Sequence, residues 1–447
     1  LFRSNGYNAS GLFSSFARIN YKLMERYLFT FTGRYDGSSM FGSNNRYGFF
    51  PSGAIAWRIS QEKFMKNLTF INDLKLRASV GTTGTQNLTS FSNRDLYEAT
   101  SYNNLSAIIH KQVGNRDIRW EKSTQYDLGL DFALFDYRLT GSISGYIKDT
   151  KDLIWSFDFP PSATGGSMQM NRNIGALTNR GIEINLVGRV LSTKDWNLDL
   201  TLNMSHNKNK VTKLVEEGRA QSAMDVVVQG SYADQVLAVG YPMGAFHGYE
   251  YAGIIQDQAR IDELNAYAKS KGQSYYDGNS LKPGHLEIKD LNGDGIINYN
   301  DRVIIGNPDP DLFGGLTANL SYKQFSLFAN FGYQIGGLKI YNKTLQNLPG
   351  QLTGLIDYGL NDRWSDTNKN AKYPALYIGD GVPRLTDHEL FNASFFRLQE
   401  VRLTYNLPLN KVIKGQLFVS ATNLFTLTSY PGTDPATVNR NSKIGRA

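Results

Sequence analysis

The stretch WNLDLTLNMSHN, residues 196–207, alternates apolar and polar side chains with a period of two. One set of positions holds Trp196, Leu198, Leu200, Leu202 and Met204, and the positions between them hold only Asn, Asp, Thr and Ser. Successive side chains of a β-strand point to opposite faces. The pattern therefore predicts a strand with one fully apolar and one fully polar face.

The same alternation returns in FSLFANFGYQ, residues 325–334, and in GLTANLSYK, residues 315–323. Only the short link around Lys323 and Gln324 separates these two stretches. Two alternating stretches joined by so short a link predict a β-hairpin.

Five further strand pairs follow the same plan along the chain. The pattern pairs residues 13–21 with 27–35, 123–134 with 137–147, 181–191 with 196–206, 49–59 with 74–80 across a helical link SQEKFMKN, and 395–405 with 416–424 across NLPLNKVIK. This makes about a dozen strands, each near the length of roughly 9 to 11 residues that crosses a membrane as a tilted barrel strand.

Short links alternate with much longer ones rich in Gly, Asn, Asp and Ser. The long segments are residues 82–119, 150–179, 207–313 and 337–393. An outer-membrane barrel has short periplasmic turns, long extracellular loops, an apolar face toward lipid and a polar face toward its lumen. The expected fold is therefore all-β: a transmembrane antiparallel β-barrel with long extracellular loops, placed in the outer membrane as a multi-pass protein.

The composition agrees with this interpretation and narrows the function. The 447 residues include 26 Tyr and 25 Phe, no Cys, and no apolar run long enough for a membrane-spanning helix. The net charge of +7 is spread without a basic run, so we expect no nucleic-acid partner. No signal peptide is visible at Leu1.

The stretch DLNGDGIINYND, residues 290–301, has the spacing of a calcium-binding loop. The expected oxygen ligands are Asp290, Asn292, Asp294, the backbone carbonyl of Ile296, Asn298 and Asp301. The alternative is an Asn/Asp/Gly-rich turn without a metal. Asp301 is shorter than the bidentate Glu of calcium sensors, so we expect structural Ca²⁺ rather than a switch.

Nothing in the sequence indicates an enzyme. The five histidines, at positions 110, 206, 247, 285 and 388, lack metal-ligand spacing, and no nucleophile elbow or phosphate-binding glycine motif is present. We therefore expect no catalytic residues.

The pattern of residues 256–272 predicts a small surface helix with Ile261, Leu264 and Ala268 on one face.

Several longer motifs resemble one protein family. LKLRASVGTTGTQN (residues 74–87), GHLEIKDLNGDGIINYNDRVIIGNPDPDLFGGLTANLSYKQFSL (284–327), FFRLQEVRLTYNLP (395–408) and SATNLFTLTSYPGTDP (420–435) are similar to the SusC/RagA family. These are TonB-dependent outer-membrane transporters of the Bacteroidetes. The resemblance runs over nearly the whole chain in a fixed order.

The resemblance implies a 22-stranded barrel, of which this chain forms part. It also implies nutrient uptake, with import of glycan oligosaccharides or oligopeptides driven by TonB, ExbB and ExbD through an N-terminal region. The implied partners are a SusD-like surface lipoprotein that acts as a lid, outer-membrane lipid, and a second SusCD pair in a dimer.

The sequence also departs from the family pattern. It shows no recognisable plug domain and no TonB box, and it lacks the family's last strand. Residues 1–447 are therefore expected to form a partial β-barrel domain, within which residues 207–313 form a long extracellular loop region that carries the loop 290–301. The N-terminal plug is expected to lie outside this chain.

Two other classes of protein stay open. One is an outer-membrane porin or adhesin without energy coupling, and the other is a soluble glycan-binding β-sandwich with structural calcium. The sequence offers Tyr102, Trp155, Phe157, Met168, Asn103, Asn104, Gln169 and Asn171 as loop residues that suit a sugar or a peptide. Packing of the loops onto each other or against a lid protein is the favoured explanation of these residues, so the substrate-binding residues are unknown.

Overall fold

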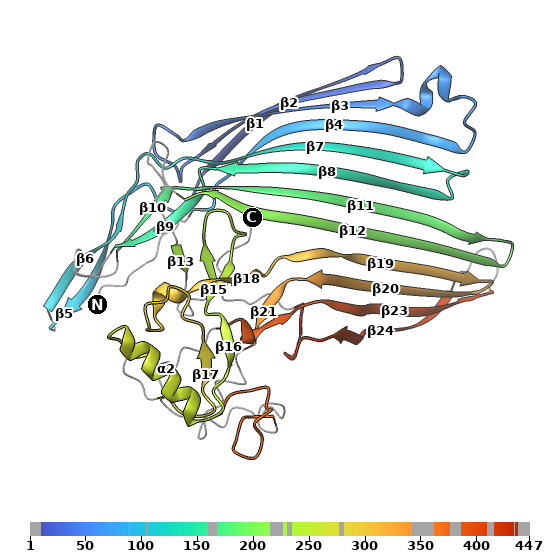
Figure 1. The fold of residues 1–447 in the computed structure, drawn as a ribbon. Coiled ribbons are helices and arrows are strands. Elements are labelled where there is room, and N and C mark those ends of the chain that lie inside the picture. The colour runs from blue at the N-terminus through green and yellow to red at the C-terminus, as the bar shows by residue number, and fades with distance from the viewer. Residues whose placement is uncertain are drawn as a thin grey trace.

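A computed structural model describes residues 10–88, 90–103, 105–159, 168–214, 227–229, 235–276, 281–341, 362–375, 386–408, 415–432 and 434–436. Its main element is a curved antiparallel sheet of twelve strands (Figure 1), in the order β1-β2-β3-β4-β7-β8-β11-β12-β19-β20-β23-β24. In this part of the chain β1 pairs only with β2, and β24 only with β23. The sheet is therefore open, with two edges.

Each predicted strand pair is confirmed by the register of the sheet. The strands are β1 (Leu12–Leu23), β2 (Tyr27–Ser38), β3 (Tyr47–Arg58), β4 (Ile71–Thr85), β7 (Glu121–Leu134), β8 (Leu139–Lys151), β11 (Ala176–Ser192), β12 (Trp196–Lys213), β19 (Pro310–Tyr322), β20 (Phe325–Gly336), β23 (Phe395–Leu407) and β24 (Gly415–Thr428).

Many strands of the sheet extend beyond the limits predicted from the sequence. Strand β12 continues to Lys213 and β19 begins at Pro310, so both ends of the predicted loop region 207–313 belong to the sheet. The predicted helical link between β3 and β4 is confirmed, and it consists of two 3₁₀ helices, η1 (Ile59–Gln61) and η2 (Lys63–Met65). The strands run beyond the predicted limits because polar residues near their outer ends still pair with neighbours, although they break the apolar alternation.

Apolar residues meet across the strands in continuous rows on one face. In one row Leu76 lies beside Leu130, which is followed by Ile143, Ile184 and Met204 on successive strands. A second row contains Leu74, Phe132, Gly141, Leu186, Leu202, Leu316, Phe331 and Leu398. These rows confirm the predicted period of two, because one slip in register would interrupt them with polar residues.

Aromatic pairs mark the two ends of this apolar band. Near the short links Trp196 lies 4.2 Å from Tyr322, between ring centroids, and Phe325 lies 4.9 Å from Tyr405. Toward the other end Tyr333 lies beside Gly314, which lies beside Met204. The eight residue-to-residue steps from Trp196 to Met204 correspond to about 20 Å of height for a strand tilted by about 40°. This suits the aromatic belts of a membrane-spanning barrel.

The long segments fold into smaller units at the opposite end from the short links (Figure 1). A helix α2 (Gln258–Ser270) lies in one of them, and in the described part of the chain no helix is long and apolar enough to cross a membrane. The small strands are β5 (Leu96–Tyr102), β6 (Leu105–Val113), β9 (Ile154–Phe159), β10 (Met168–Asn173), β13 (Val227–Gln229), β14 (Gln235–Leu237), β15 (Ala245–Gly248), β16 (Tyr251–Ile254), β17 (Leu286–Ile288), β18 (Val303–Gly306), β21 (Leu338–Ile340) and β22 (Leu390–Asn392), and the short turns are η3 (Tyr299–Asp301) and η4 (Asp387–Glu389).

The predicted surface helix is confirmed. Asp257 caps α2 by accepting a hydrogen bond from the Arg260 amide, and Ile261, Leu264 and Ala268 are buried. They pack in a cluster with Tyr249, Ile255, Tyr275, Tyr276, Ile288 and Ile297. This cluster is the largest apolar core among the described residues, so the loop unit has a core of its own outside the barrel wall.

Close approach between strands makes Gly314 hard to replace. A Cβ atom there would lie 2.0 Å from the carbonyl oxygen of Asn203 and 2.8 Å from the Tyr333 hydroxyl. We expect Gly314→Val to reduce the free energy of folding into lipid vesicles by about 1 to 3 kcal/mol. The measurement is a urea titration followed by gel mobility. Gly188→Val is the control, since its Cβ would have only Val190 within 4 Å, at 3.9 Å; equal losses in the two variants would contradict this explanation.

Candidate functional site: the inner wall and the outer loops

The polar face of the sheet carries both paired charges and neutral amides. On β4, Lys75 and Arg77 both contact Asp131 on β7, at 2.8 Å and 3.2 Å. Toward the other edge the Asn330 side chain accepts a hydrogen bond from the Thr317 hydroxyl and donates one to Gln399. Charges are present near that edge as well, where Arg397 pairs with Asp434 and Arg402 lies over the Phe328 ring. Such a wall can hydrogen-bond a polar solute without presenting a large net charge to it.

The long segments pack against this polar face near its outer end. Phe50 of β3 points to that side and is buried with Phe41, Ile118 and Trp120 from the loops. On β12, Val211 is buried with Leu214 and Leu237. These contacts identify the polar face as the inner wall, because the loops cover its outer end, and they leave the apolar face for lipid.

The loop residues considered for substrate binding divide into three groups. Trp155 packs against the buried Val211, Leu214 and Leu237, and Asn171 donates a hydrogen bond to Ser92. Both therefore tie loops together. Met168, Gln169 and Asn103 lie at the bounds of small strands, whereas Asn104 lies outside the described residues. For Tyr102 and Phe157 only the backbone is described, so the structure assigns no substrate-binding residue.

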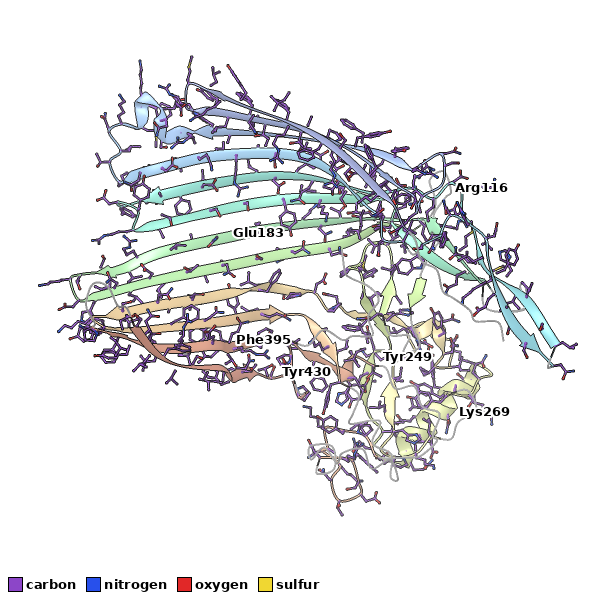
Figure 2. All side chains as sticks on the ribbon, turned by 180° about the vertical axis from the view of Figure 1, so that it is seen from behind. Arg116, Glu183, Tyr249, Lys269, Phe395 and Tyr430 are labelled. Carbon is purple, nitrogen blue, oxygen red and sulfur yellow. The ribbon has the colours of Figure 1, made fainter. Side chains whose placement is uncertain are left out.

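The predicted ion loop lies beside α2 and over the apolar core of the loop unit. In Figure 2, Tyr249 of that core and Lys269 of α2 lie in this unit, away from Glu183 on the sheet. Gly293 and Gly295 adopt positive φ angles of 73° and 88°, which a turn this tight requires. The loop is therefore a tight turn, as both sequence-based interpretations require.

The acidic side chains of the loop hold its backbone in place. Asp290 accepts hydrogen bonds from the amides of Gly293 and Gly295 and from the Tyr267 hydroxyl. Asp301 is fully buried and accepts from the amides of Leu291 and Asn298. This network explains the turn without an ion.

The remaining predicted ligands make hydrogen bonds of the same kind. The Asn292 side chain accepts from the Asp294 amide, Asp294 accepts from the Ile296 amide, and Asn298 accepts from the Asn300 amide. Partial burial tends to raise the pKa of Asp290, but the hydrogen bonds from Gly295, Tyr267 and Gly293 outweigh it and hold the pKa below its usual value. The loop therefore keeps an ionised, oxygen-rich surface of the kind that hard cations prefer.

The histidines are scattered through separate contacts. His110 contacts Asp95 at 3.2 Å, and His206 contacts the Asp311 carbonyl through Nδ1 at 2.5 Å. His388 stacks on Tyr251. Within the described ranges, no group of three or more His, Cys, Asp or Glu side chains has the arrangement of a metal site.

A buried carboxyl in the outer loops was not foreseen from the sequence. Glu389 is 2% exposed, and its Oε2 atom accepts hydrogen bonds from the amide and the hydroxyl of Thr386. Burial raises the pKa of Glu389 to about 8, although the Thr386 bonds oppose the shift. The TDHE sequence is a recognisable capping box, but nothing local to it reveals that the segment is buried.

We expect this carboxyl to make the outer loops more stable in mild acid than at pH 8. Its folded-state pKa is raised above the ordinary value of 4.5, so its stabilising contribution is complete below about pH 4.5 and is lost as the pH rises to about 8. Glu389→Gln should remove this dependence and stabilise the segment at pH 8 by about 1 to 3 kcal/mol. Hydrogen exchange of residues 386–392 at pH 5 and pH 8 measures it; a Gln variant with the pH dependence of the parent would contradict the assignment.

Comparison with known proteins gives consistent matches. The family model described as "TonB dependent receptor-like, beta-barrel" matches residues 2–299. TonB-dependent receptor P3 of Formosa agariphila is 36% identical over 98% of this chain and 43% of its own length. TonB-dependent receptor SusC of Bacteroides thetaiotaomicron is 32% identical over 95% of this chain and 41% of its own length.

Among solved structures, the RagAB peptide transporter superposes with a TM-score of 0.77 and 28% sequence identity. The match covers 95% of this chain and 45% of the transporter chain. The chain thus spans less than half the length of the curated relatives and of the solved structure described here.

Proposed function

Because this chain belongs to the family of TonB-dependent receptor-like β-barrels, we propose that it forms part of the wall of a TonB-driven nutrient importer. Like its SusC and RagA relatives, it lies in the outer membrane as part of a β-barrel. Further strands at the edges of β1 and β24 complete the wall in this proposal. Lipid offers no hydrogen bonds to the backbone groups of an open edge.

The inner wall is the observation that carries this proposal. Its paired charges and neutral amides face a lumen, whereas a purely structural sheet would gain more from an apolar core there. The proposed cargo is a glycan oligosaccharide or an oligopeptide, since both present hydroxyl or amide groups that such a wall can bind. The proposed role is transport rather than catalysis.

The proposed partners follow from the relatives. A SusD-like surface lipoprotein covers the long-loop end as a lid, and TonB with ExbB and ExbD supplies energy through an N-terminal region. Two such pairs assemble as a dimer. The loop units at the outer end support this arrangement, because they place apolar side chains such as Tyr97 and Ile108 in exposed positions outside the barrel wall.

A native purification of the full-length protein from outer membranes tests the proposal. Mass spectrometry would identify both the proteins and the small molecules that are retained in detergent. A stoichiometric surface lipoprotein with a bound oligosaccharide or peptide is expected. A barrel that is recovered alone and empty, and that shows no TonB-dependent uptake in cells, would favour the porin or adhesin.

We also propose that the loop 290–301 binds Ca²⁺ as a structural ion. The proposed ligands are Asp290, Asn292, Asp294, the Ile296 carbonyl, Asn298 and Asp301. The oxygen donors of the loop and the lowered pKa of Asp290 support the proposal. An affinity on the order of 10⁻⁴ to 10⁻³ M, as in extracellular modules, is expected.

Hydrogen exchange of residues 281–308 in the full-length protein checks this calcium prediction. Protection should rise as Ca²⁺ is added after chelation, and Asp290→Ala combined with Asp294→Ala should abolish the response while the barrel keeps its gel mobility. Asn300→Ala, which changes an exposed residue outside the ligand set, should respond as the parent does. Identical protection with and without Ca²⁺ in the parent would leave the metal-free turn as the explanation.

A further inference from the structure

The lipid-facing side of the sheet carries a depression that the import function does not use. It has a volume of about 550 Å³ and spans β7, β8, β11 and β12. Its apolar lining includes Tyr126, Leu128, Ile147 and Ile182, and its polar lining includes Arg180, His206 and Lys208. All seven side chains fall on the positions that continue the apolar rows, so they point to lipid rather than to the lumen.

The depression lies where one row of lipid-facing residues contains a glycine, which has no side chain to fill the space. Gly145 lies between Leu128 on β7 and Ile182 on β11, and His206 follows on β12. The next row outward consists of Tyr126, Ile147, Arg180 and Lys208. Gly145 forms the floor of the depression. Apolar side chains border it toward the middle of the sheet, and Arg180 and Lys208 border it toward the long loops, so the depression is an amphipathic groove.

The height of the cations matches the membrane boundary. Lys208 lies twelve residues beyond Trp196 on β12, which corresponds to about 30 Å of height for a strand tilted by about 40°. The apolar band of an outer-membrane barrel is about 25 Å tall. Arg180 and Lys208 therefore lie about at the level of the outer headgroups, on the long-loop side of the membrane.

The positive charge of this patch is not compensated within the fold. Arg180 and Lys208 are exposed, and neither forms an ion pair with a carboxylate in the described ranges. Lys210 continues the patch toward the long loops. Asp149 lies in the same row as Lys210, and its carboxylate accepts a hydrogen bond from the Thr178 hydroxyl. Comparable positions of β2, β3 and β20 carry Tyr35, Tyr47, Phe49 and Ile335, so the charge is confined to one sector.

We propose that this groove binds a phosphorylated glycolipid of the outer leaflet, of the lipid A type. Its phosphate is held by the Arg180 guanidinium and the Lys208 ammonium, which form strong hydrogen bonds with phosphate oxygens. An acyl chain lies along Leu128, Gly145 and Ile182. The opposite polarity of the two ends of the groove matches the two ends of such a lipid and fixes its orientation.

Affinity measurements on the full-length protein in detergent test the proposal. The probes are bisphosphorylated lipid A, the same glycolipid without phosphate, and inorganic phosphate. We expect Arg180→Gln combined with Lys208→Gln to weaken lipid A binding by about tenfold or more. Lys148→Gln is the matched control, since it neutralises a cation at a similar height on the inner face, and it should change binding by less than about twofold.

A second variant tests the groove without changing the charge. A Cβ at Gly145 would have only the Gly181 carbonyl oxygen within 4 Å, at 3.7 Å, so the strand accommodates a side chain there. Gly145→Phe should fill the groove and weaken lipid A binding while leaving the weak binding of inorganic phosphate unchanged. Gel mobility before and after heating confirms that each variant is folded, and Lys208→Gln alone serves if the double variant does not assemble.

Three results would overturn the proposal. They are equal affinity for the glycolipid with and without phosphate, equal losses in Lys148→Gln and in the Arg180 and Lys208 double variant, and inorganic phosphate that binds as tightly as lipid A. None of these results depends on import, because the probes bind the outer surface of the barrel and no transport is measured.

Discussion

We expect Leu200→Arg to reduce the free energy of barrel assembly by about 2 to 4 kcal/mol and Asn203→Arg to reduce it by less than about 1 kcal/mol. Both residues lie on β12, only three positions apart. Leu200 is on the apolar face, beside Gly188 of β11 and Ala318 of β19. Asn203 is on the inner face, beside Asn185 and Gly315.

The size of the difference follows from the depth of Leu200. It lies four residues from Trp196 at one aromatic belt and four from Met204, whose row contains Tyr333 at the other. An Arg side chain at this midpoint must leave its guanidinium in hydrocarbon or stretch far to reach the headgroups. At Asn203 the same side chain enters a polar lumen and keeps its hydration.

Folding of the full-length protein into lipid vesicles, titrated with urea and read by gel mobility, measures both variants. Leu200→Ala is the control for lost packing, and it should cost less than Leu200→Arg because it removes volume without adding charge. Equal losses for the Arg variants at positions 200 and 203 would show that the two faces are assigned wrongly.

Asp301→Ala has the second largest expected effect and lowers the stability of the outer loop unit by about 3 kcal/mol. The carboxylate is fully buried and accepts hydrogen bonds from the Leu291 and Asn298 amides, at 3.1 Å and 2.9 Å. Alanine leaves both donors without this acceptor, and an unsatisfied buried donor costs about 1 to 3 kcal/mol.

Limited proteolysis and hydrogen exchange of residues 281–308 in chelator-treated protein measure this effect independently of any ion. Asp301→Asn keeps one acceptor oxygen and should show about half the loss. Asp294→Ala is the matched control, because Asp294 is only partly buried and accepts from the Ile296 amide and the Asn292 side chain. Equal losses at positions 294 and 301 would argue against burial as the cause.

The loop 290–301 illustrates how much of a candidate site can be predicted from sequence. The positions of the acidic residues and the two glycines predict a tight, oxygen-rich turn, and the structure has that turn. Calcium itself stays a prediction, because the same carboxylates bind the amides of the loop. Short-range spacing determines which oxygens lie near one another. It does not determine whether these oxygens coordinate a cation or accept hydrogen bonds from backbone amides.

The amphipathic groove around Gly145 illustrates the opposite case. Arg180 and Lys208 lie just beyond the predicted strands 181–191 and 196–206, and only the structure extends β11 and β12 far enough to place them on the lipid-facing side. Their combination with Tyr126, Leu128 and Gly145 was not predicted either, because it depends on the register among four strands. Glu389 is similar, since its segment pairs with Tyr249 and Tyr341, which lie far away in the sequence.

The sequence by itself determined the strands, their two faces, the hairpins and the family of this protein. The strands, their faces and the hairpins depend on a period of two and on short links, which are local properties of the chain, whereas the family follows from the resemblance of longer motifs. Only the tertiary structure decided how the long segments pair, as when β15 joins β18, and which side chains meet across the sheet. Contacts between residues far apart in the chain leave no periodic pattern in the sequence. They contribute to stability only once the folded sheet brings these residues together.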